Sequence, residues 1–158
     1  MPILIDSNVL VYLFDGGDEP RRQRALQVVL ELGDNGQGCL SAQCLSEFFS
    51  VTTSEKRGNP PLLATDLAAQ RAGEFSRSFE TFPVTPQVVL EAIRGTIQHE
   101  FQFWDALIWA AARLNQVQIV FSEDFRDSSV VEGVRFVNPF SSAFQIEDWV
   151  NPRDFREV

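Results

Sequence analysis

The sequence has few residues of the types that build disulfide frameworks and zinc sites. Its 158 residues include two cysteines, Cys39 and Cys44, and one histidine, His99. Two cysteines are too few for a disulfide framework, and one histidine is too few to complete a zinc site with them, so we expect packed free thiols. We also expect His99, near the end of a predicted helix, to be structural or exposed to solvent rather than a catalytic base.

Long apolar runs are missing as well. No stretch is long enough to span a bilayer, and the first residues lack the basic start and apolar segment of a signal peptide. We therefore expect a soluble cytoplasmic protein with no membrane association.

Positive charge is scarce, with a formal net charge of -9. This argues against a protein that holds nucleic acid by a basic surface. A phosphate-containing substrate stays compatible if acidic residues bind divalent cations, because bound metal reverses the local field. The basic residues that exist are grouped, as Arg21, Arg22 and Arg24 and as Lys56 and Arg57. Each group is either a solvated helix face or end, or a set of substrate-binding residues.

Length and a hydrophobic content of 44% fit one domain with a substantial core. Apolar patterns and turn signals predict strands at 2–5, 38–40, 82–84, 118–121 and 134–137, the last at a sheet edge, with helices between them, including 41–56, 62–79 and 103–112. Such alternation is typical of an α/β fold, here a three-layer α/β/α sandwich with a short central, mostly parallel sheet. We assign residues 1–140 to this domain and 141–158 to a tail that packs on the domain or on a partner.

The first ten residues contain the feature around which the chain is organised. A short buried strand runs directly into Asp6, followed by Ser7 and Asn8 and then by helical apolar spacing. Open parallel sheets bind their ligands at the carboxyl ends of strands, where this arrangement places Asp6. The alternative is that Asp6 or Ser7 only caps the following helix.

Three further carboxylates are expected at the same edge of the sheet. Glu47 lies near the amino end of a helix, Asp105 begins a helix rich in aromatic and aliphatic residues, and Asp124 follows a buried strand. Each also has a local explanation, namely a favourable helix dipole, a helix cap and a turn, respectively. Converging carboxylates repel one another unless hard cations lie between them, and Mg²⁺ or Mn²⁺ suits a site made of oxygen ligands.

Four motifs together resemble the PIN domain family, in particular the compact VapC-type ribonuclease toxins of prokaryotic toxin–antitoxin pairs. They are Ile5-Asp6-Ser7-Asn8-Val9-Leu10, the helix of Glu47, Phe103-Trp104-Asp105-Ala106-Leu107-Ile108 and Phe121-Ser122-Glu123-Asp124. The resemblance covers residues 2 to about 140. It implies an endoribonuclease that hydrolyses RNA phosphodiester bonds with water activated by Mg²⁺ or Mn²⁺, and it suggests a homodimer and a cognate antitoxin.

The family's metal-binding acidic residues correspond to Asp6, Glu47, Asp105 and Asp124, and its small polar residue corresponds to Ser122. We expect Asp6 and Asp105 to bind metal directly, with Glu47 and Asp124 completing the ring directly or through water. Around this ring, Ser7, Asn8 and Ser122 would orient carboxylates and waters. Asp127 is close enough in sequence to share or replace the role of Asp124, and Arg21, Arg22 and Arg24 are the candidate substrate-binding residues.

Two other functions compete with the nuclease. A phosphohydrolase of the haloacid dehalogenase type also begins with a strand and an aspartate, but it needs a second aspartate where this chain has Asn8 and a downstream lysine. The single lysine, Lys56, comes too early for that role. The second alternative is a catalytically weak PIN-like module that binds RNA or serves in assembly.

Overall fold

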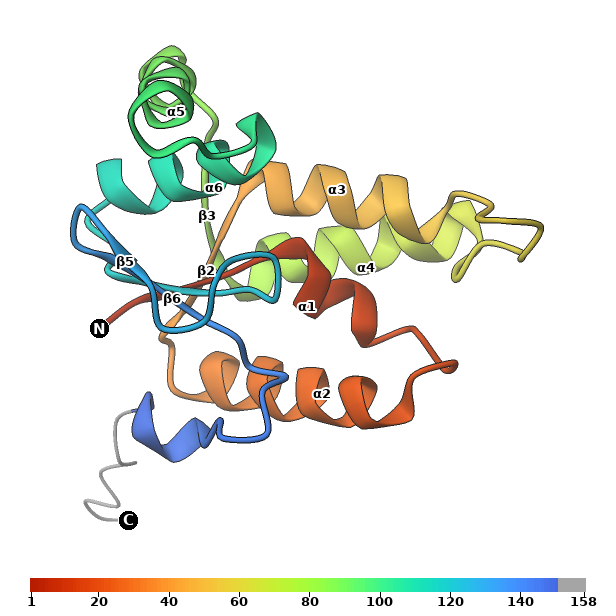
Figure 1. Cartoon of the computed structure of the whole chain (residues 1–158). Coiled ribbons are helices and arrows are strands. Elements are labelled where there is room, and N and C mark those ends of the chain that lie inside the picture. Colours follow the sequence, from red (N-terminus) through yellow and green to blue (C-terminus); the bar gives the residue numbers. More distant parts are fainter. Residues whose placement is uncertain (151–158) are drawn as a thin grey trace.

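The computed structural model, which describes residues 1–150, forms one six-stranded sheet in the order β3-β2-β1-β4-β6-β5 (Figure 1). Neighbouring strands from β3 to β6 pair in parallel, and β5 pairs antiparallel with β6. The strands are β1 (Ile3–Ile5), β2 (Gly38–Ser41), β3 (Glu80–Phe82), β4 (Ile119–Phe121), β5 (Val130–Val131) and β6 (Val134–Val137).

Helices cover both faces of this sheet. They are α1 (Ser7–Tyr12), α2 (Glu19–Asp34), α3 (Ala42–Thr52), α4 (Thr65–Ser78), α5 (Pro86–His99) and α6 (Phe103–Leu114), followed by a short 3-10 helix, η1 (Ile146–Asp148). In Figure 1, α2 lies on one side of the sheet and α3 and α6 lie on the other, with α5 outside α6. The predicted α/β/α architecture with a mostly parallel sheet is confirmed.

The register of β1 and β4 places two polar residues side by side. Ile5 pairs with Phe121 in the parallel ladder, so Asp6 and Ser122 leave adjacent strands at the same edge. Main-chain bonds continue beyond the strands, because the Asp6 N–H donates to the Phe121 carbonyl at 3.0 Å and the Ser122 N–H donates to the Val137 carbonyl at 3.0 Å. The carboxyl edge of the sheet therefore holds both residues rigidly.

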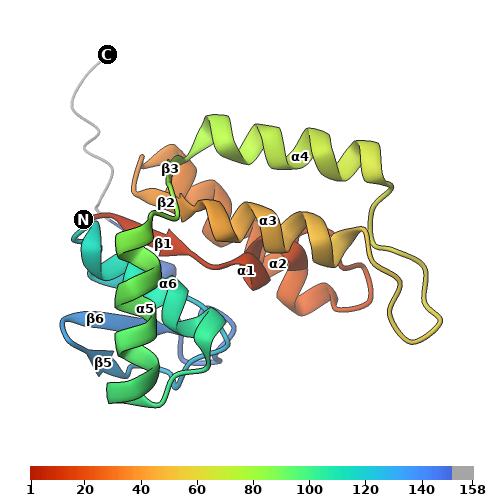
Figure 2. The same ribbon diagram turned by 90° about the horizontal axis from the view of Figure 1, so that it is seen from above.

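Several predicted boundaries were wrong. The strand at 134–137 is not at the edge, because the unpredicted β5 turns back through Glu132 and Gly133 and pairs with it. Gly133 has a φ of 85°, which suits glycine in such a turn. The helix expected at 62–79 begins at Thr65, after Pro60 and Pro61, and the helix expected at 41–56 ends at Thr52. The segment between these two helices projects from the body (Figure 2).

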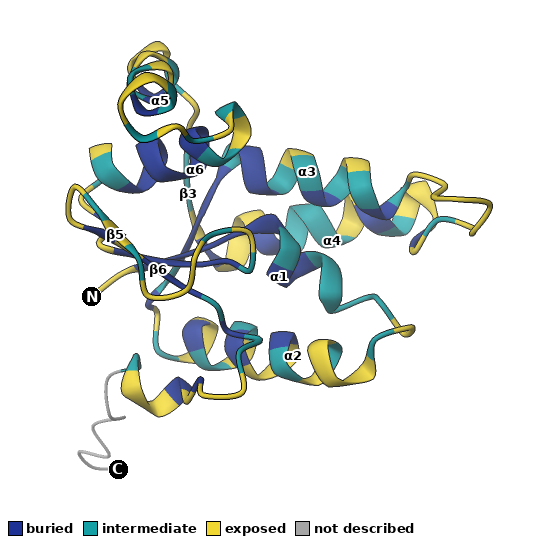
Figure 3. Cartoon of the chain, in the orientation of Figure 1, coloured by how far each residue is buried: buried dark blue, intermediate teal, exposed yellow. Residues whose placement is uncertain are grey.

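The core lies between the sheet and the helices (Figure 3). All three residues of β1 and of β4 are buried, as are residues 106–112 of α6. The aromatic and aliphatic residues at 103–112 predict a central helix, and this prediction fails only at its start, where Trp104 is 57% exposed. Cys39 and Cys44 are buried free thiols, as predicted. Within the described residues, no helix is long and apolar enough to cross a bilayer.

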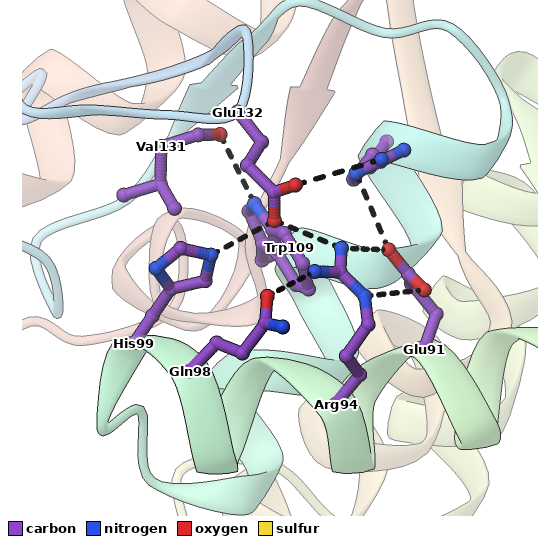
Figure 4. A network of polar contacts seen from close by, with 8 residues as sticks. Glu91, Arg94, Gln98, His99, Trp109, Val131 and Glu132 are labelled. Carbon is purple, nitrogen blue, oxygen red and sulfur yellow. Dashed lines mark hydrogen bonds and ion pairs between the residues drawn. The ribbon is translucent and has the colours of Figure 1, made fainter.

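A polar network fastens the turn between β5 and β6 to α5 and α6 (Figure 4). Glu132 lies 2.8 Å from both Arg94 Nη2 and His99 Nε2, and these hydrogen bonds lower the pKa of Glu132 to about 2. The guanidinium of Arg94 also lies over the Trp109 ring, whose Nε1 donates to the Val131 carbonyl at 3.1 Å. His99 thus contacts a structural ion pair.

The segment after β6 packs on the domain as far as the structure describes it. Phe144 is buried, and its ring lies 5.4 Å from that of Phe121. Arg24 Nη1 donates to the carbonyls of Pro139 and Phe144, both at 3.1 Å. Residues 151–158 of the predicted tail lie outside the described residues.

Candidate active site

Asp6 joins the end of β1 to the start of α1. Its Oδ1 accepts the Ser7 N–H at 2.7 Å, so the residue is the N-cap of α1, and its Oδ2 accepts the Ser122 hydroxyl at 2.7 Å. Only 3% of Asp6 is exposed. Burial raises the pKa of Asp6 to about 7, opposed by the bonds from Ser122 and Ser7 and reinforced by the charges of Asp124 and Glu47. Asp6 therefore caps α1, and burial destabilises its ionised form.

Ser122 is the hub of the polar contacts at this edge. Its Oγ accepts hydrogen bonds from Asn8 Nδ2 and from the Asp124 N–H, both at 3.1 Å. Because both contacts deliver hydrogens to Oγ, the hydrogen of the Ser122 hydroxyl is left to point at Asp6. The serine therefore fixes the Asp6 carboxylate and the turn that carries Asp124.

Asn8 links this hub to Asp124. Its Nδ2 also donates to Asp124 Oδ2 at 3.0 Å, and a carboxylate accepts only, so the amide orientation is determined. Asn8 Oδ1 is consequently a buried acceptor with no partner in the described part of the chain. Asp124 itself is exposed.

Glu47 reaches the same group from α3. It lies in the second turn of this helix, later than the predicted position near the amino end. The Ser7 hydroxyl lies 3.3 Å from Glu47 Oε2 and 3.4 Å from Asp6 Oδ1, and its single hydrogen serves one carboxylate at a time. Glu47 Oε1 is buried and has no hydrogen-bond partner among residues 1–150.

Asp105 lies in the first turn of α6, where the helix dipole favours negative charge. The residue is half-buried, and its side chain does not cap the helix, whose N-cap is Gln102. Burial raises the pKa of Asp105, and the charges of Asp124 and Glu47 raise it further. The structure thus brings together the four predicted carboxylates closely enough for mutual repulsion.

Two cavities meet at this acidic cluster, by which we mean Asp6, Glu47, Asp105 and Asp124. One of about 740 Å³ extends toward the start of α6, and its walls include Gln102, Trp104 and Asp105. The other, about 670 Å³, extends toward the loop after α3 and includes Tyr12, Lys56 and Asn59. Glu47 and Asp124 line both. We call the two adjoining cavities the groove: Glu47 and Asp124 lie where they adjoin, Asp105 lines the first, and the buried Asp6 lines neither.

A second polar network flanks the acidic cluster and was not predicted. The Tyr12 hydroxyl donates to Glu123 Oε1 at 2.6 Å, and Arg21 Nε donates to Glu123 Oε2 at 3.2 Å. Burial and the bond to Glu123 raise the pKa of Tyr12 well above its ordinary value. Both carboxylate oxygens of Glu123 are thereby engaged, one by Tyr12 and the other by Arg21. Tyr12 and Glu123 are 111 residues apart, so sequence spacing gave no signal for this pair.

The remaining predicted residues lie elsewhere. Asp127 Oδ1 accepts the Asn138 N–H at 2.8 Å, and the residue lines a separate cavity of about 120 Å³. Arg22 pairs with Glu19 at 2.6 Å on the surface of α2. Arg24 holds the segment after β6, as described above, which leaves Arg21 as the member of this group that contacts a residue of the groove.

The residues of the acidic cluster fit a hard divalent cation by their chemistry. The donors are oxygens only, and the buried Glu47 Oε1 and Asn8 Oδ1 lack hydrogen-bond partners within residues 1–150. A cation would satisfy such oxygens and offset the burial and the mutual repulsion that raise the pKa of Asp6 and Asp105. In the described part of the chain, no three His, Cys, Asp or Glu side chains already have the arrangement of a complete metal site.

Solved structures with the same fold include toxins of toxin–antitoxin systems. A toxin–antitoxin complex from Klebsiella pneumoniae superposes with a TM-score of 0.62 at 20% identity, covering 87% of this chain and 97% of that chain. VapC20 of Mycobacterium tuberculosis, a toxin that cleaves the sarcin-ricin loop, gives 0.62 at 23% identity, with 84% and 98% covered. DNA-bound VapBC from Salmonella typhimurium gives 0.58 at 16% identity, with 86% and 96% covered.

A comparison with curated proteins gave no match. The sequence model of the PIN domain family, however, matches residues 3–131, which include the whole acidic cluster. This match covers most of the sequence and agrees with the observed sheet order and with the structural neighbours. The chain therefore belongs to the PIN domain family.

Proposed function

We propose that this chain is an endoribonuclease dependent on Mg²⁺ or Mn²⁺ and that it is the toxin of a toxin–antitoxin pair. The observation that carries the proposal is the convergence of Asp6, Glu47, Asp105 and Asp124, three of which line the groove, together with buried oxygens of Glu47 and Asn8 that lack partners within residues 1–150. Membership of the PIN family supports nuclease chemistry and leaves no reason to retain the haloacid dehalogenase alternative.

Asp6, Glu47, Asp105 and Asp124 are the residues that would hold the cation. When bound, such a cation lowers the pKa of water and offsets charge on the phosphate oxygens. Ser122 and Asn8 hold Asp6 and Asp124 in place through the contacts described above, and Ser7 lies between Asp6 and Glu47. The chain's own contribution is thus to position carboxylates, bind the RNA strand and keep Glu123 engaged by Tyr12 and Arg21.

The charge of the groove limits how RNA can bind. The acidic cluster repels a phosphate backbone, and the cavity toward the loop after α3 supplies one basic side chain, Lys56. Lys56 is the only lysine of the sequence. We assign it a contact with a backbone phosphate on one side of the scissile bond, and we keep Arg21 as a second candidate at the rim.

A homodimer and an antitoxin are the proposed protein partners. The solved toxin–antitoxin complexes with the same fold support the antitoxin, whose matching chemistry would be a basic segment that enters the acidic groove. For the homodimer, Leu90, Ile93 and Ile97 lie on one face of α5 with their side chains exposed. Ile97→Glu should then convert a dimer to a monomer in light scattering.

RNA cleavage by the purified chain tests the nuclease directly. Single-stranded RNA should be cut with Mg²⁺ or Mn²⁺, EDTA should stop the reaction, and Asp105→Asn should lower the rate by at least about 100-fold. Asp66→Asn is the matched control, because Asp66 also lies in the first turn of a helix without a side-chain cap, but in α4. A folded wild-type chain that leaves RNA intact with both metals would favour the catalytically weak binding module.

A further inference from the structure

Trp104 presents an aromatic surface beside the acidic cluster. It is 57% exposed at the start of α6, while residues 106–112 of the same helix are buried. It lines the cavity of about 740 Å³ together with Glu47, Asp105 and Asp124. Covering the exposed face of this indole with an apolar or aromatic group would be favourable, because it removes apolar surface from water.

Neighbouring residues hold Trp104 in a fixed position. Gln43 Nε2 donates to the Trp104 carbonyl at 2.9 Å, which ties the first turn of α6 to α3. The Phe103 ring meets the indole edge to face, with centroids 5.2 Å apart and an interplanar angle of 69°. A supported aromatic ring is an effective stacking surface, because little side-chain entropy is lost when a ligand binds.

The other walls of this cavity identify the part of a nucleotide that it suits. They carry the polar side chains of Gln102, Ser46 and Ser50 and the three carboxylates, and no basic side chain of the described residues lines it. Apart from a cation held by the carboxylates, this cavity offers no positive charge to a phosphate, whereas the indole and the amide and hydroxyl groups suit a neutral base. Its volume is within the ~300–1,000 Å³ typical of small-ligand sites.

We propose that Trp104 is the stacking platform for one unpaired base of the RNA, next to the phosphate that is cleaved. This inference rests on the proposed ribonuclease function and specifies its substrate as RNA that is single-stranded at the cleavage site. Lys56 lines one cavity, Trp104 lines the other, and Glu47 and Asp124 line both, so a strand that contacts Lys56 and Trp104 would pass the acidic cluster. A base held in a duplex cannot use this platform, because its faces are already stacked.

Tryptophan fluorescence of an inactive protein tests the contact without cleavage. In Asp6→Asn, an unpaired RNA oligonucleotide with Mg²⁺ should quench the emission, and a fully paired duplex should not. Introducing Trp104→Phe into this protein should remove the quenching and keep most of the affinity, whereas Trp104→Leu should weaken binding by about 5- to 150-fold. Leu114→Ala, an exposed apolar residue on the same helix, is the control and should bind as the parent does.

An RNA lacking one base locates the partner of the indole. A substrate made abasic at the stacked position should raise the KM of the wild-type protein about as much as Trp104→Leu does, and the two changes together should cost no more than either one. If the two changes together raise KM by the product of their separate effects, or if Trp104→Leu leaves KM unchanged, the stacking role of Trp104 is wrong.

Failure of this inference is separable from failure of the nuclease. If the wild-type protein cuts RNA and Trp104→Leu has the same KM and kcat, the nuclease stands and the stacking role is wrong. If Trp104→Leu instead changes the molecular mass in light scattering without changing RNA affinity, the indole belongs to a contact with a second copy, and the stacking role is again wrong.

Discussion

The Ser122 hydroxyl donates a 2.7 Å hydrogen bond to Asp6 Oδ2 and thereby joins the ends of two adjacent parallel strands that are 116 residues apart in sequence. The same oxygen accepts the Asp124 N–H and the Asn8 amide. One hydroxyl thus sets the positions of two carboxylates and an amide.

Ser122→Ala should lower the free energy of unfolding by about 1–3 kcal/mol, because it leaves the buried partners of the hydroxyl unsatisfied. Ser129→Ala is a suitable control, since the Ser129 hydroxyl donates to the Arg126 carbonyl at an exposed position, and it should cost less than about 0.5 kcal/mol. Urea unfolding monitored by circular dichroism measures both. Equal losses in the two variants would show that the hub does not stabilise the fold.

Ionised Asp6 should destabilise the metal-free fold. Because burial raises the pKa of Asp6 to about 7, the folded protein binds this proton more tightly than the unfolded chain does. The favourable contribution is complete below pH 4 and is lost as pH rises to about 7. Asp6→Asn lacks this loss, so its stability relative to wild type should increase by roughly 1–4 kcal/mol between pH 5 and pH 8 in EDTA.

Denaturant unfolding at the two pH values gives this difference. Asp66→Asn, at an exposed position of α4, is the control variant. A constant difference between Asp6→Asn and wild type across this pH range would mean that Asp6 is not destabilised by ionisation in the folded protein.

Arg22 and Arg24 should differ in what they do for the fold. Arg24→Ala removes the bonds to the Pro139 and Phe144 carbonyls and should lower the free energy of unfolding by about 1–3 kcal/mol. Arg22→Ala removes an exposed ion pair with Glu19 and should cost less than about 0.5 kcal/mol. Thermal unfolding compares them. If both variants instead unfold like wild type and weaken RNA binding, the arginines bind the substrate, which is one of the two roles that their grouping in the sequence allows.

The carboxylates that converge on the sheet edge were predictable, since the ends of parallel strands meet there. Asp6 and Asp124 each follow a short apolar strand, and this local pattern determined their placement. The contact between Tyr12 and Glu123 could not be predicted, because it depends on how α1 and the turn after β4 meet in space. Sequence periodicity carries no information on such long-range polar pairs.

The wrong predictions for the strand at 134–137 and for the start of α6 have local physical causes. A two-residue strand such as β5 is too short to show alternation, so the strand at 134–137 was assigned to the edge. Likewise, the apolar residues around Asp105 suggested a central helix. The sequence cannot tell that the first turn of α6 opens onto a cavity and exposes Trp104.

Lys56 should contribute one phosphate contact. In Asp6→Asn background protein, Lys56→Gln should weaken RNA binding and reduce the slope of log K against log salt concentration by about 0.7. Arg57→Gln is the matched control, since Arg57 is the exposed neighbour and does not line the cavity. Fluorescence anisotropy at several salt concentrations measures the slope. An equal reduction in both variants would indicate a general charge effect instead of a contact.

Binding of Mn²⁺ to the RNA-free protein, measured by titration calorimetry at pH 7.5, tests the metal site most directly. Wild type and Asp66→Asn should bind the ion with the same affinity. Asp105→Asn should bind it at least about 10-fold more weakly. The side chain of Asp105 makes no hydrogen bond within the described residues, so its replacement breaks none. Affinity should also rise with pH through about 7, because Mn²⁺ competes with the proton on Asp6. Equal affinity in all three proteins would contradict a metal site at the acidic cluster.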